Sequence, residues 1–350
     1  MTQQSHPKIS ILMPVYNGEK YLHSVMKNMI DQTFKEFELL IMNDGSTDRS
    51  GEILETYAKK DHRIKIFHQK NSGIVKSLNT LATHAKAEIM ARMDADDKAY
   101  PERLQIQHEY MTKHPETVLL GSGCVVFRDG VEKTGINDAF SEDFMNRWFL
   151  VFNCAFTHST IMYRKKAFIA AGGYWQSEYP AEDYGLWIRM KKFGKIENLP
   201  NILGEYRLNS NSISAKNFRK QIRARNRLNG VNFEDIYQAN EIPEIPLVQK
   251  TLSHYWMDRH RKQVFAKLSC LTGCFLVKKG ELQRAIPYFK WAFHMSKKRL
   301  DALLSLLLVK TGIAVYVSID AYLKLRTLTP QIRWFKREKT PGSTKVTQQK

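Results

Sequence analysis

Short apolar runs alternate with helical patterns through the first part of the chain, and this alternation is the feature that most restricts the fold. Four runs have the length and composition of buried strands, at Lys8–Val15, Phe37–Met42, Ile64–Phe67 and Glu88–Met93. Between them, apolar residues recur at helical spacing, for example from Leu22 to Ile30. Strands and helices that alternate with short connections form a parallel sheet with right-handed crossovers. The sequence therefore predicts an α/β domain.

Polar residues follow three of these predicted strands. Asn17 follows the first strand, Asp44 follows the second and Asp94 follows the fourth. In open parallel sheets, ligands bind at the carboxyl ends of the strands. We therefore expect these three side chains to converge on one edge of the sheet.

Three carboxylates crowd together after the fourth strand, at Asp94, Asp96 and Asp97. Their mutual repulsion costs free energy, which a nearby positive charge would offset. A divalent cation that holds a phosphorylated substrate is the obvious candidate, because hard cations prefer oxygen ligands. We expect Asp97 to cap the helix that begins near Pro101 rather than to bind the cation.

Residues 118–210 have a less regular pattern. We expect Trp175 and Trp187 to lie in the core rather than to serve as stacking platforms for a ligand. His158 could contact a substrate or could satisfy backbone groups, and the sequence favours neither. The other predicted features are an apolar stretch at Val118–Phe127, a helix near Glu142–Val151, the segment Thr157–Tyr163 and a helix through Tyr184–Lys192.

Positive charge is concentrated in the C-terminal part of the chain. Residues 1–215 carry a net charge of +1 and residues 216–350 carry +18, out of a total of +19. Such a surface suits nucleic acid or phospholipid headgroups, although it could also be a solvated helical face. We therefore predict a catalytic domain over residues 1–215, a basic helical region over residues 216–340 and a disordered tail over residues 341–350.

The segment Ala302–Ile319 contains one charged residue, Lys310, among eighteen residues. It could be a buried helix, a helix in the membrane interface or a membrane span. No secretory signal is visible at the N-terminus, and the four cysteines show no zinc-site spacing. These features predict a cytoplasmic location, and with the basic region they predict a peripheral position on the inner face of the membrane.

Five motifs in order, PVYNGEKYL, NDGSTD, NSGIVKSLN, ARMDADD and AEDYGLWIRM, resemble those of family 2 glycosyltransferases with the GT-A fold. Each motif alone is weak, but five in this order are specific, and the resemblance covers about residues 8 to 213. It implies a GT-A catalytic domain with a Rossmann-like, mostly parallel sheet, followed here by a smaller helical C-terminal region.

The resemblance also implies a function. The expected reaction is the inverting transfer of a sugar from a nucleotide-sugar, with UDP as the expected nucleotide and Mn²⁺ or Mg²⁺ as the metal. The acceptor would be a lipid-linked or other saccharide in O-antigen, capsule or exopolysaccharide synthesis. The implied roles are Pro14, Tyr16, Asn17 and Glu19 at the nucleotide, Asp44 at the uracil ring, Asp94 at the ribose or diphosphate, Asp94 and Asp96 at the metal, and Asp183 as catalytic base.

The chain departs from the family pattern in two places. Many relatives have an arginine where this chain has Leu78, and Lys76 is the expected replacement for that cationic contact. Relatives often have a histidine where Asn209 stands, so the role of Asn209 is left open, while Arg207 is the expected phosphate contact. Glu182 could orient the loop through a salt bridge, or it could exchange roles with Asp183.

Two other classes of protein compete with this interpretation. A sugar-phosphate nucleotidyltransferase would also use a carboxylate metal site, but it should carry a Gly-rich basic loop after the first strand, where this chain has only Lys20. A non-catalytic nucleic-acid-binding protein would fit the charge, but no recognised binding module is present. We therefore expect an anionic membrane surface, and no nucleic acid, as the macromolecular partner.

Overall fold

The structure is a computed structural model that describes residues 6–129, 131–137, 154, 156–209, 212–229, 269, 273, 276 and 281–295. The chain divides into two compact units, Met1–Tyr255 and Trp256–Lys350. The predicted features at Glu142–Val151, Ala302–Ile319 and residues 341–350 lie outside the described residues. The predicted boundary after residue 215 stays a prediction.

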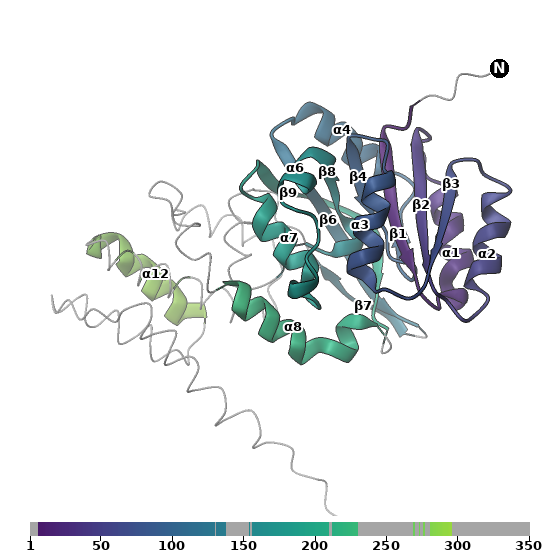
Figure 1. The fold of residues 1–350 in the computed structure, drawn as a ribbon. Coiled ribbons are helices and arrows are strands. Elements are labelled where there is room, and N and C mark those ends of the chain that lie inside the picture. The colour runs from purple at the N-terminus through teal and green to yellow at the C-terminus, as the bar shows by residue number, and fades with distance from the viewer. Residues whose placement is uncertain are drawn as a thin grey trace, which may run out of the picture. The chain divides into compact units, whose positions relative to one another are not determined.

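A sheet of nine strands forms the centre of the first unit (Figure 1). The strand order is β3-β2-β1-β4-β8-β6-β9-β5, and β7 pairs with β6 outside this series. The strands are β1 (Ile9–Val15), β2 (Phe37–Asp44), β3 (Ile64–Gln69), β4 (Ile89–Arg92), β5 (Lys98–Ala99), β6 (Thr117–Arg128), β7 (Val131–Asn137), β8 (Met162–Arg164) and β9 (Lys195–Arg207).

The four strands predicted first form a parallel half of the sheet. β1 lies between β2 and β4 and is parallel to both, with Ile9 opposite Phe37 on one side and Ile89 on the other. β3 continues the parallel arrangement beside β2. This arrangement confirms the predicted parallel sheet. Because the strands run in one direction, the loops after β1, β2 and β4 open at the same edge.

The second half of the sheet mixes directions. β8 runs antiparallel between β4 and β6, whereas the long strands β6 and β9 are parallel to each other. The end of β9 returns to the loop after β4, where the backbone N–H of Arg207 donates to Asp97 Oδ1 at 2.8 Å. Asp97 therefore holds the end of β9. The predicted cap was wrong, because Glu102 occupies the N-cap of the next helix and no side chain caps it.

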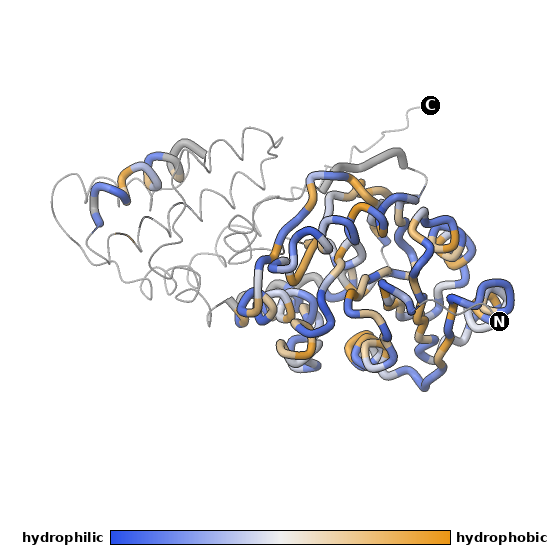
Figure 2. Tube along the Cα trace, turned by 90° about the horizontal axis from the view of Figure 1, so that it is seen from above, coloured by the Kyte–Doolittle hydropathy of each residue, from blue (hydrophilic) through white to orange (hydrophobic). Residues whose placement is uncertain are grey.

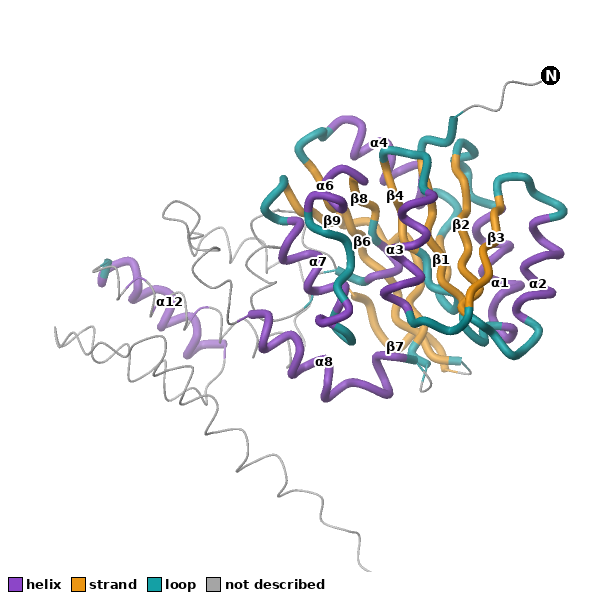
Figure 3. Tube along the Cα trace, viewed as in Figure 1, coloured by secondary structure: helices purple, strands orange, loops and turns teal. Residues whose placement is uncertain are grey.

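Helices cover both faces of the sheet (Figures 1 and 3). α3, α6 and α7 contribute to the core on one face, and α1, α2 and α4 contribute to the core on the other. The helices of the first unit are α1 (Glu19–Ile30), α2 (Ser50–Ala58), α3 (Ile74–His84), α4 (Arg103–Lys113), α6 (Lys165–Ala170), α7 (Glu182–Met190) and α8 (Ile213–Asn229), with 3₁₀ turns η1 (His158–Thr160) and η2 (Gln176–Glu178).

The side chains of β1 and β2 alternate between these two cores. Ile11 and Ile41 pack beneath α1 and α2, whereas Leu12 and Leu40 pack beneath α3. Successive residues of a strand point to opposite faces, so a strand covered on both faces is apolar at most positions. Ser10 and Glu38 are buried exceptions, and Ser10 Oγ donates to Glu38 Oε1 at 2.7 Å. Figure 2 shows hydrophobic and hydrophilic residues alternating along the surrounding helices, as one-sided burial requires. Each fully buried large apolar side chain stabilises the fold by about 1.5–3 kcal/mol.

Among the described residues of the second unit, Leu282–Met295 form the helix α12. Its buried residues Ala285, Phe289 and Ala292 follow the spacing of a single helical face. Among the residues that the structure describes, no helix has the length and apolar character that a membrane crossing requires.

Candidate active site

A cleft of about 1310 Å³ opens at the edge where β1, β2 and β4 end. Side chains from distant parts of the sequence line it, which confirms that the polar residues after these strands converge. Most of the predicted site residues lie in its wall, namely Pro14, Tyr16, Asn17, Asp44, Asp94, Asp96, Asp183 and Arg207. Glu19 and Lys76 do not line the cleft.

The loop after β1 is tied to the loop after β2. Asn17 has a positive φ of 50°, and its Oδ1 accepts a hydrogen bond from the backbone of Thr47 at 2.8 Å. Glu19 Oε2 accepts from the backbone of Arg49 at 2.9 Å. Asn17 and Glu19 therefore hold the two loops together, and the carboxylate of Glu19 points to its neighbour rather than to the cleft. Tyr16 is exposed at the rim.

Asp44 organises the next loop. It is the last residue of β2 and is only 4% exposed. Its Oδ1 accepts from the backbone of Ser72 at 2.8 Å and from Gln69 Nε2 at 2.7 Å, and its Oδ2 accepts from the backbone of Gly73 at 2.9 Å. The carboxylate thus joins the ends of β2 and β3 to the start of α3. Contact with uracil stays a prediction.

Lys76 was predicted to supply a cation to the cleft. It lies in the first turn of α3, directly after the loop that Asp44 holds, and its side chain is exposed. The cleft wall near it is formed by the neighbouring Ile74 and Val75. The structure does not bring Lys76 into the cleft with the other predicted residues.

The carboxylates after β4 rest on buried arginines. Arg92 is 0% exposed, and its Nη2 lies 2.5 Å from Asp94 Oδ1. Arg103 is also buried and donates to the backbone oxygens of Arg92 and Ile161 at 2.8 and 3.2 Å. Burial, and then the charge of Arg92, lower the pKa of Arg103 to about 10. Arg92 therefore offsets part of the negative charge of the turn after β4.

Asp96 lines the cleft, whereas Asp97 does not. Burial and the neighbouring charge of Asp94 raise the pKa of Asp96 to about 6. Asn209 Nδ2 donates to Asp96 Oδ2 over 3.5 Å. Asn209, whose role the sequence leaves open, is thus placed at the carboxylate that was predicted to bind metal.

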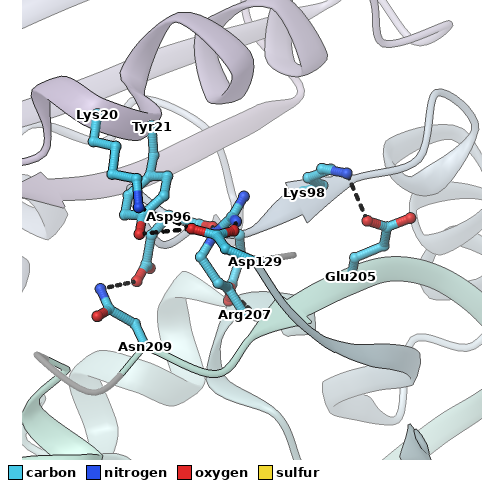
Figure 4. Close-up of polar contacts among 9 residues, drawn as sticks. Lys20, Tyr21, Asp96, Lys98, Asp129, Glu205, Arg207 and Asn209 are labelled. Atoms are coloured by element: carbon cyan, nitrogen blue, oxygen red, sulfur yellow. Dashed lines mark hydrogen bonds and ion pairs between the residues drawn. The ribbon is translucent and has the colours of Figure 1, made fainter. Parts of the chain in front are cut away.

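Arg207 connects this turn to the outer rim (Figure 4). Its Nε donates to the backbone oxygen of Asp96 at 2.7 Å, and its Nη1 pairs with Asp129. Its guanidinium lies between the rings of Tyr21 and Phe127, 4.3 and 4.4 Å from their centroids. Arg207 therefore supports the turn that carries Asp96. The phosphate contact stays a prediction.

Asp129 is the centre of the contacts in Figure 4, although no sequence motif singles it out. Its Oδ2 lies 3.0 Å from Lys20 Nζ and 3.2 Å from Tyr21 Oη, and its other oxygen pairs with Arg207. It joins α1 to the ends of β6 and β9. The opposite wall of the cleft is formed by the start of α7.

Asp183 and Glu182 are the first two residues of α7 and both line the cleft. Asp183 Oδ1 accepts from the backbone of Tyr184 at 2.7 Å. Burial and the charge of Asp94 raise the pKa of Asp183, while the hydrogen bond from Tyr184 and the charge of Arg225 act in the opposite direction. An aspartate with a raised pKa in a cleft suits proton abstraction, because its basicity lies nearer to neutral pH.

Two tryptophans and a histidine near this wall take different positions. Trp187 is fully buried, as predicted. Trp175 is 46% exposed, so its predicted core position was wrong, and the guanidinium of Arg189 stacks over it at 4.0 Å. His158 lines the cleft and its Nε2 lies 2.8 Å from Tyr174 Oη. Burial and the charge of Arg92 lower the pKa of His158 well below its ordinary value, so the ring is neutral.

Comparison with known proteins identifies the family. The model of glycosyl transferase family 2 matches residues 10–172. The putative glycosyltransferase EpsE of Bacillus subtilis is 32% identical over 220 residues, which are 61% of this chain and 78% of EpsE. This chain belongs to glycosyl transferase family 2. It is a glycosyltransferase, and the predicted family and fold are confirmed.

Two further family 2 relatives have similar coverage. The amylovoran biosynthesis glycosyltransferase AmsE of Erwinia amylovora is 30% identical, over 59% of this chain and 79% of AmsE. The O-antigen biosynthesis glycosyltransferase WbnJ of Escherichia coli is 30% identical, over 58% of this chain and 81% of WbnJ. Among solved structures, TarS 1-349 of S. aureus in complex with UDP-GlcNAc has a TM-score of 0.56 at 20% identity, covering 88% of both chains. This last likeness supports the fold.

Sequence reasoning missed three residues of this family 2 site. Arg92 is part of the motif ARMDADD, but its position in a predicted strand did not indicate that its side chain would pair with Asp94. Arg103 lies in the following helix, and Asp129 lies at the turn between β6 and β7. No local pattern could have found either one, because their partners are distant in sequence.

Proposed function

We propose that this glycosyltransferase moves a sugar, with inversion, from a UDP-sugar to a hydroxyl group of a saccharide acceptor. One observation carries the proposal. A single cleft joins Asp94 and Asp96 at the end of β4 to Asp183 at the start of α7, a separation of almost ninety residues in sequence. The nucleotide would lie over the loops held by Asn17 and Asp44, as the resemblance implies.

The residues at the end of β4 fit a divalent cation. Carboxylate oxygens are the ligands that Mg²⁺ and Mn²⁺ prefer, and the raised pKa of Asp96 marks an excess of negative charge that a cation would relieve. The described residues contain no group of three or more His, Cys, Asp or Glu side chains that could hold a metal. We infer that Asp96, supported by Asp94, would hold Mn²⁺ or Mg²⁺ together with oxygens of the diphosphate. A bound cation would stabilise the charge that develops on the leaving diphosphate.

Asp183 is our candidate for the catalytic base. In the proposed reaction its carboxylate accepts the proton of the acceptor hydroxyl while that oxygen bonds to the anomeric carbon. The bond from this carbon to the diphosphate oxygen breaks, and the nucleoside diphosphate leaves with the electron pair. A single displacement of this kind inverts the anomeric configuration, and no covalent intermediate with the enzyme is needed.

The names of relatives support the proposed acceptor, and the distribution of positive charge supports the proposed location. The names of AmsE and WbnJ place those relatives in amylovoran and O-antigen biosynthesis, which supports a bacterial surface polysaccharide as the product. α8 carries the exposed cations Lys220, Arg223 and Arg227 after its kink at Asn217, and residues 216–350 carry a net charge of +18. We propose that this surface binds anionic lipids at the inner face of the membrane, where a lipid-linked acceptor would be presented.

The test of the proposed function begins with a panel of nucleotide-sugars, with release of the nucleoside diphosphate as the readout. Asp183→Asn should bind the accepted donor as the wild type does, yet transfer at least about 100-fold more slowly, because general-base catalysis contributes about 10²–10⁴-fold. Asp31→Asn, at an exposed position after α1, is the matched control and should transfer normally. Transfer by Asp183→Asn at the rate of this control would remove Asp183 as the base.

The metal assignment has its own test. Asp96→Ala should lose the stimulation of donor binding by Mn²⁺, measured by calorimetry with and without the ion. A variant whose binding still rises with Mn²⁺ as in the wild type would place the metal elsewhere.

A further inference from the structure

Glu182 is a buried residue whose carboxyl group keeps one oxygen unpaired among the described residues. It is 5% exposed and forms part of the cleft wall. Its Oε2 has no hydrogen-bond partner within the part of the chain that the structure describes. A buried polar atom is normally paired, and leaving it unpaired destabilises the fold. Because Glu182 lines the cleft, a ligand bound there could supply the missing partner.

Glu178, four residues earlier, shows how the same segment treats a glutamate that serves the fold. It is also buried, at 4% exposed, and its Oε2 likewise has no partner among the described residues, but its Oε1 pairs with Arg189 of α7. Gly185 makes room for this pair, because a Cβ atom at Gly185 would come within 2.2 Å of the carboxylate of Glu178. Glu178 does not line the cleft. The loop is therefore anchored by Glu178, and Glu182 is not needed for that purpose.

The charge around Glu182 indicates which form of the side chain faces the cleft. Burial and the adjacent charge of Asp183 raise the pKa of Glu182 to about 8. At neutral pH the carboxyl group is therefore mostly protonated. A protonated carboxyl group has one O–H donor and keeps acceptor capacity, so it can both give and receive a hydrogen bond.

A sugar hydroxyl is the ligand that fits this group. Hydroxyl groups also both donate and accept, and they carry no charge that the nearby carboxylates of Asp183 and Asp94 would repel. A phosphate would bring more negative charge beside Asp183 and Asp94, so a neutral hydroxyl suits this position better. In the proposed function the diphosphate lies beside Asp94 and Asp96.

We propose that Glu182 is a specificity-determining residue whose carboxyl group exchanges hydrogen bonds with a hydroxyl of the sugar beside the reacting carbon. This inference rests on the proposed function, since it assumes that a sugar occupies the cleft next to Asp183. The hydroxyl could belong to the transferred sugar or to the acceptor, and both have the same chemistry. Glu182 thus selects among sugars, whereas Asp183 removes the proton.

The experiment compares Glu182→Leu and Glu182→Gln with the wild type. The probes are UDP alone and the accepted member of a panel of UDP-glucose, UDP-galactose, UDP-GlcNAc and GDP-mannose, with calorimetric dissociation constants. Glu182→Leu should bind UDP as the wild type does but bind the UDP-sugar about tenfold or more weakly, because one hydrogen bond is lost and a polar ligand group is left unpaired. Glu182→Gln should stay within about threefold of the wild type, because an amide also donates and accepts.

A second arm separates the two sources of the hydroxyl. If Glu182 contacts the acceptor, Glu182→Leu should bind the UDP-sugar and hydrolyse it in water as the wild type does, while the KM for the acceptor rises. Either pattern supports the proposal. Wild-type binding of donor and acceptor by Glu182→Leu would overturn it.

Thermal unfolding distinguishes a binding role from a structural one. If Glu182 serves ligand binding, Glu182→Leu should have an unfolding temperature equal to or above that of the wild type, because an unpaired polar atom is replaced by an apolar side chain of similar size. A lower unfolding temperature together with equal losses of UDP and UDP-sugar binding would instead assign Glu182 to the fold.

The failure of this inference differs from the failure of the proposed function. A wild type that binds no nucleotide-sugar of the panel contradicts both. A wild type that binds one of them, with Glu182→Leu binding it equally well and using the acceptor normally, contradicts the role of Glu182 alone. Loss of transfer in Glu182→Gln together with active Asp183→Asn would make Glu182 the base and overturn the division of roles.

Discussion

Asp44 on one side of the cleft and Glu182 on the other are both buried carboxylic acids, but their surroundings differ. Asp44 accepts three hydrogen bonds from Gln69, Ser72 and Gly73. Glu182 keeps one oxygen without a partner and has a raised pKa. The loops at the ends of β2 and β3 are thus completed by the protein, whereas we propose that a ligand completes the hydrogen bonding at the start of α7.

This contrast separates the parts of the cleft that are built for shape from those that are built for chemistry. A carboxylate with all its acceptors filled fixes backbone positions, and its loss should appear first in stability. Acidic groups that are buried and close together, as Glu182 and Asp183 are, have perturbed pKa values and lower stability in return for reactivity. Variants on the two sides should therefore fail in different ways.

The largest effect on stability is expected from Asp44→Ala. The variant leaves the backbone N–H groups of Ser72 and Gly73 and the side chain of Gln69 without an acceptor, so the free energy of unfolding should fall by about 2–4 kcal/mol. Urea titration measures this quantity. The control Asp31→Ala, at an exposed position, should change it by less than about 0.5 kcal/mol. Equal values for the two variants would remove the contrast between the walls.

A pair of glycine variants tests how tightly the loop beside Asp44 is closed. Gly45 has a φ of +69°, and a Cβ atom there would come within 2.5 Å of the backbone nitrogen of Asn71. Gly73 has a φ of +86°, but a Cβ atom there would meet nothing within 4 Å. Both alanine variants should be destabilised by about 1–3 kcal/mol through backbone strain. Gly45→Ala should lose clearly more, and urea midpoints in the reverse order would contradict the close approach of the loops.

The pH dependence of stability tests the surroundings of Glu182 at the start of α7. The pKa of Glu182 is raised from 4.5 to about 8 in the folded protein. Between these values the folded state holds a proton that the unfolded state has released, so this group favours folding at low pH and the advantage disappears as the pH rises towards 8. The unfolding temperature of the wild type should therefore fall from pH 5 to pH 8 more steeply than that of Glu182→Gln. Parallel curves for the two proteins would show that Glu182 does not titrate in this range.

The smallest effect is expected from Asp129→Asn. This carboxylate is exposed, so its pairing with Lys20 is screened by water and salt. The unfolding temperature should stay that of the wild type, and donor binding should weaken about twofold or less at low ionic strength. Titration of the donor at about 0.5 M salt should abolish even this difference. A loss as large as that of Asp96→Ala would show that Asp129 acts directly on the turn that carries Asp96.

The half of the fold that local patterns specify was predictable. The apolar runs that became β1 to β4 have both faces covered, and parallel strands necessarily bring Asn17, Asp44 and Asp94 to one edge. Asp183 could be placed only through the resemblance to the family, because nothing in its own surroundings relates it to β4. The insertion of β8 between β4 and β6 had no signal either, since it depends on pairing between distant segments.

The wrong predictions for Trp175 and Asp97 both arose because the path of a loop and contacts between distant segments set the position of the side chain. Trp175 was expected in the core from its type, but the loop that carries it leaves the ring at the surface beneath Arg189. Asp97 was expected at a helix cap, but the amide of Arg207 reached it from more than a hundred residues away. Glu19 and Lys76 stand within family motifs but do not line the cleft, and their roles at the nucleotide stay predictions.

The alternation of β1 between two cores has a consequence for the length of this strand. Inserting one apolar residue before Leu12 would keep the strand apolar but would turn each preceding side chain to the opposite face of the sheet. Inserting two would restore the layers but shift Ile9 and its neighbours by about 6.6 Å along the sheet relative to Phe37 and Ile89. We therefore expect natural relatives and engineered variants to change length in the connecting loops, and to keep β1 at a fixed count of residues ahead of Asn17.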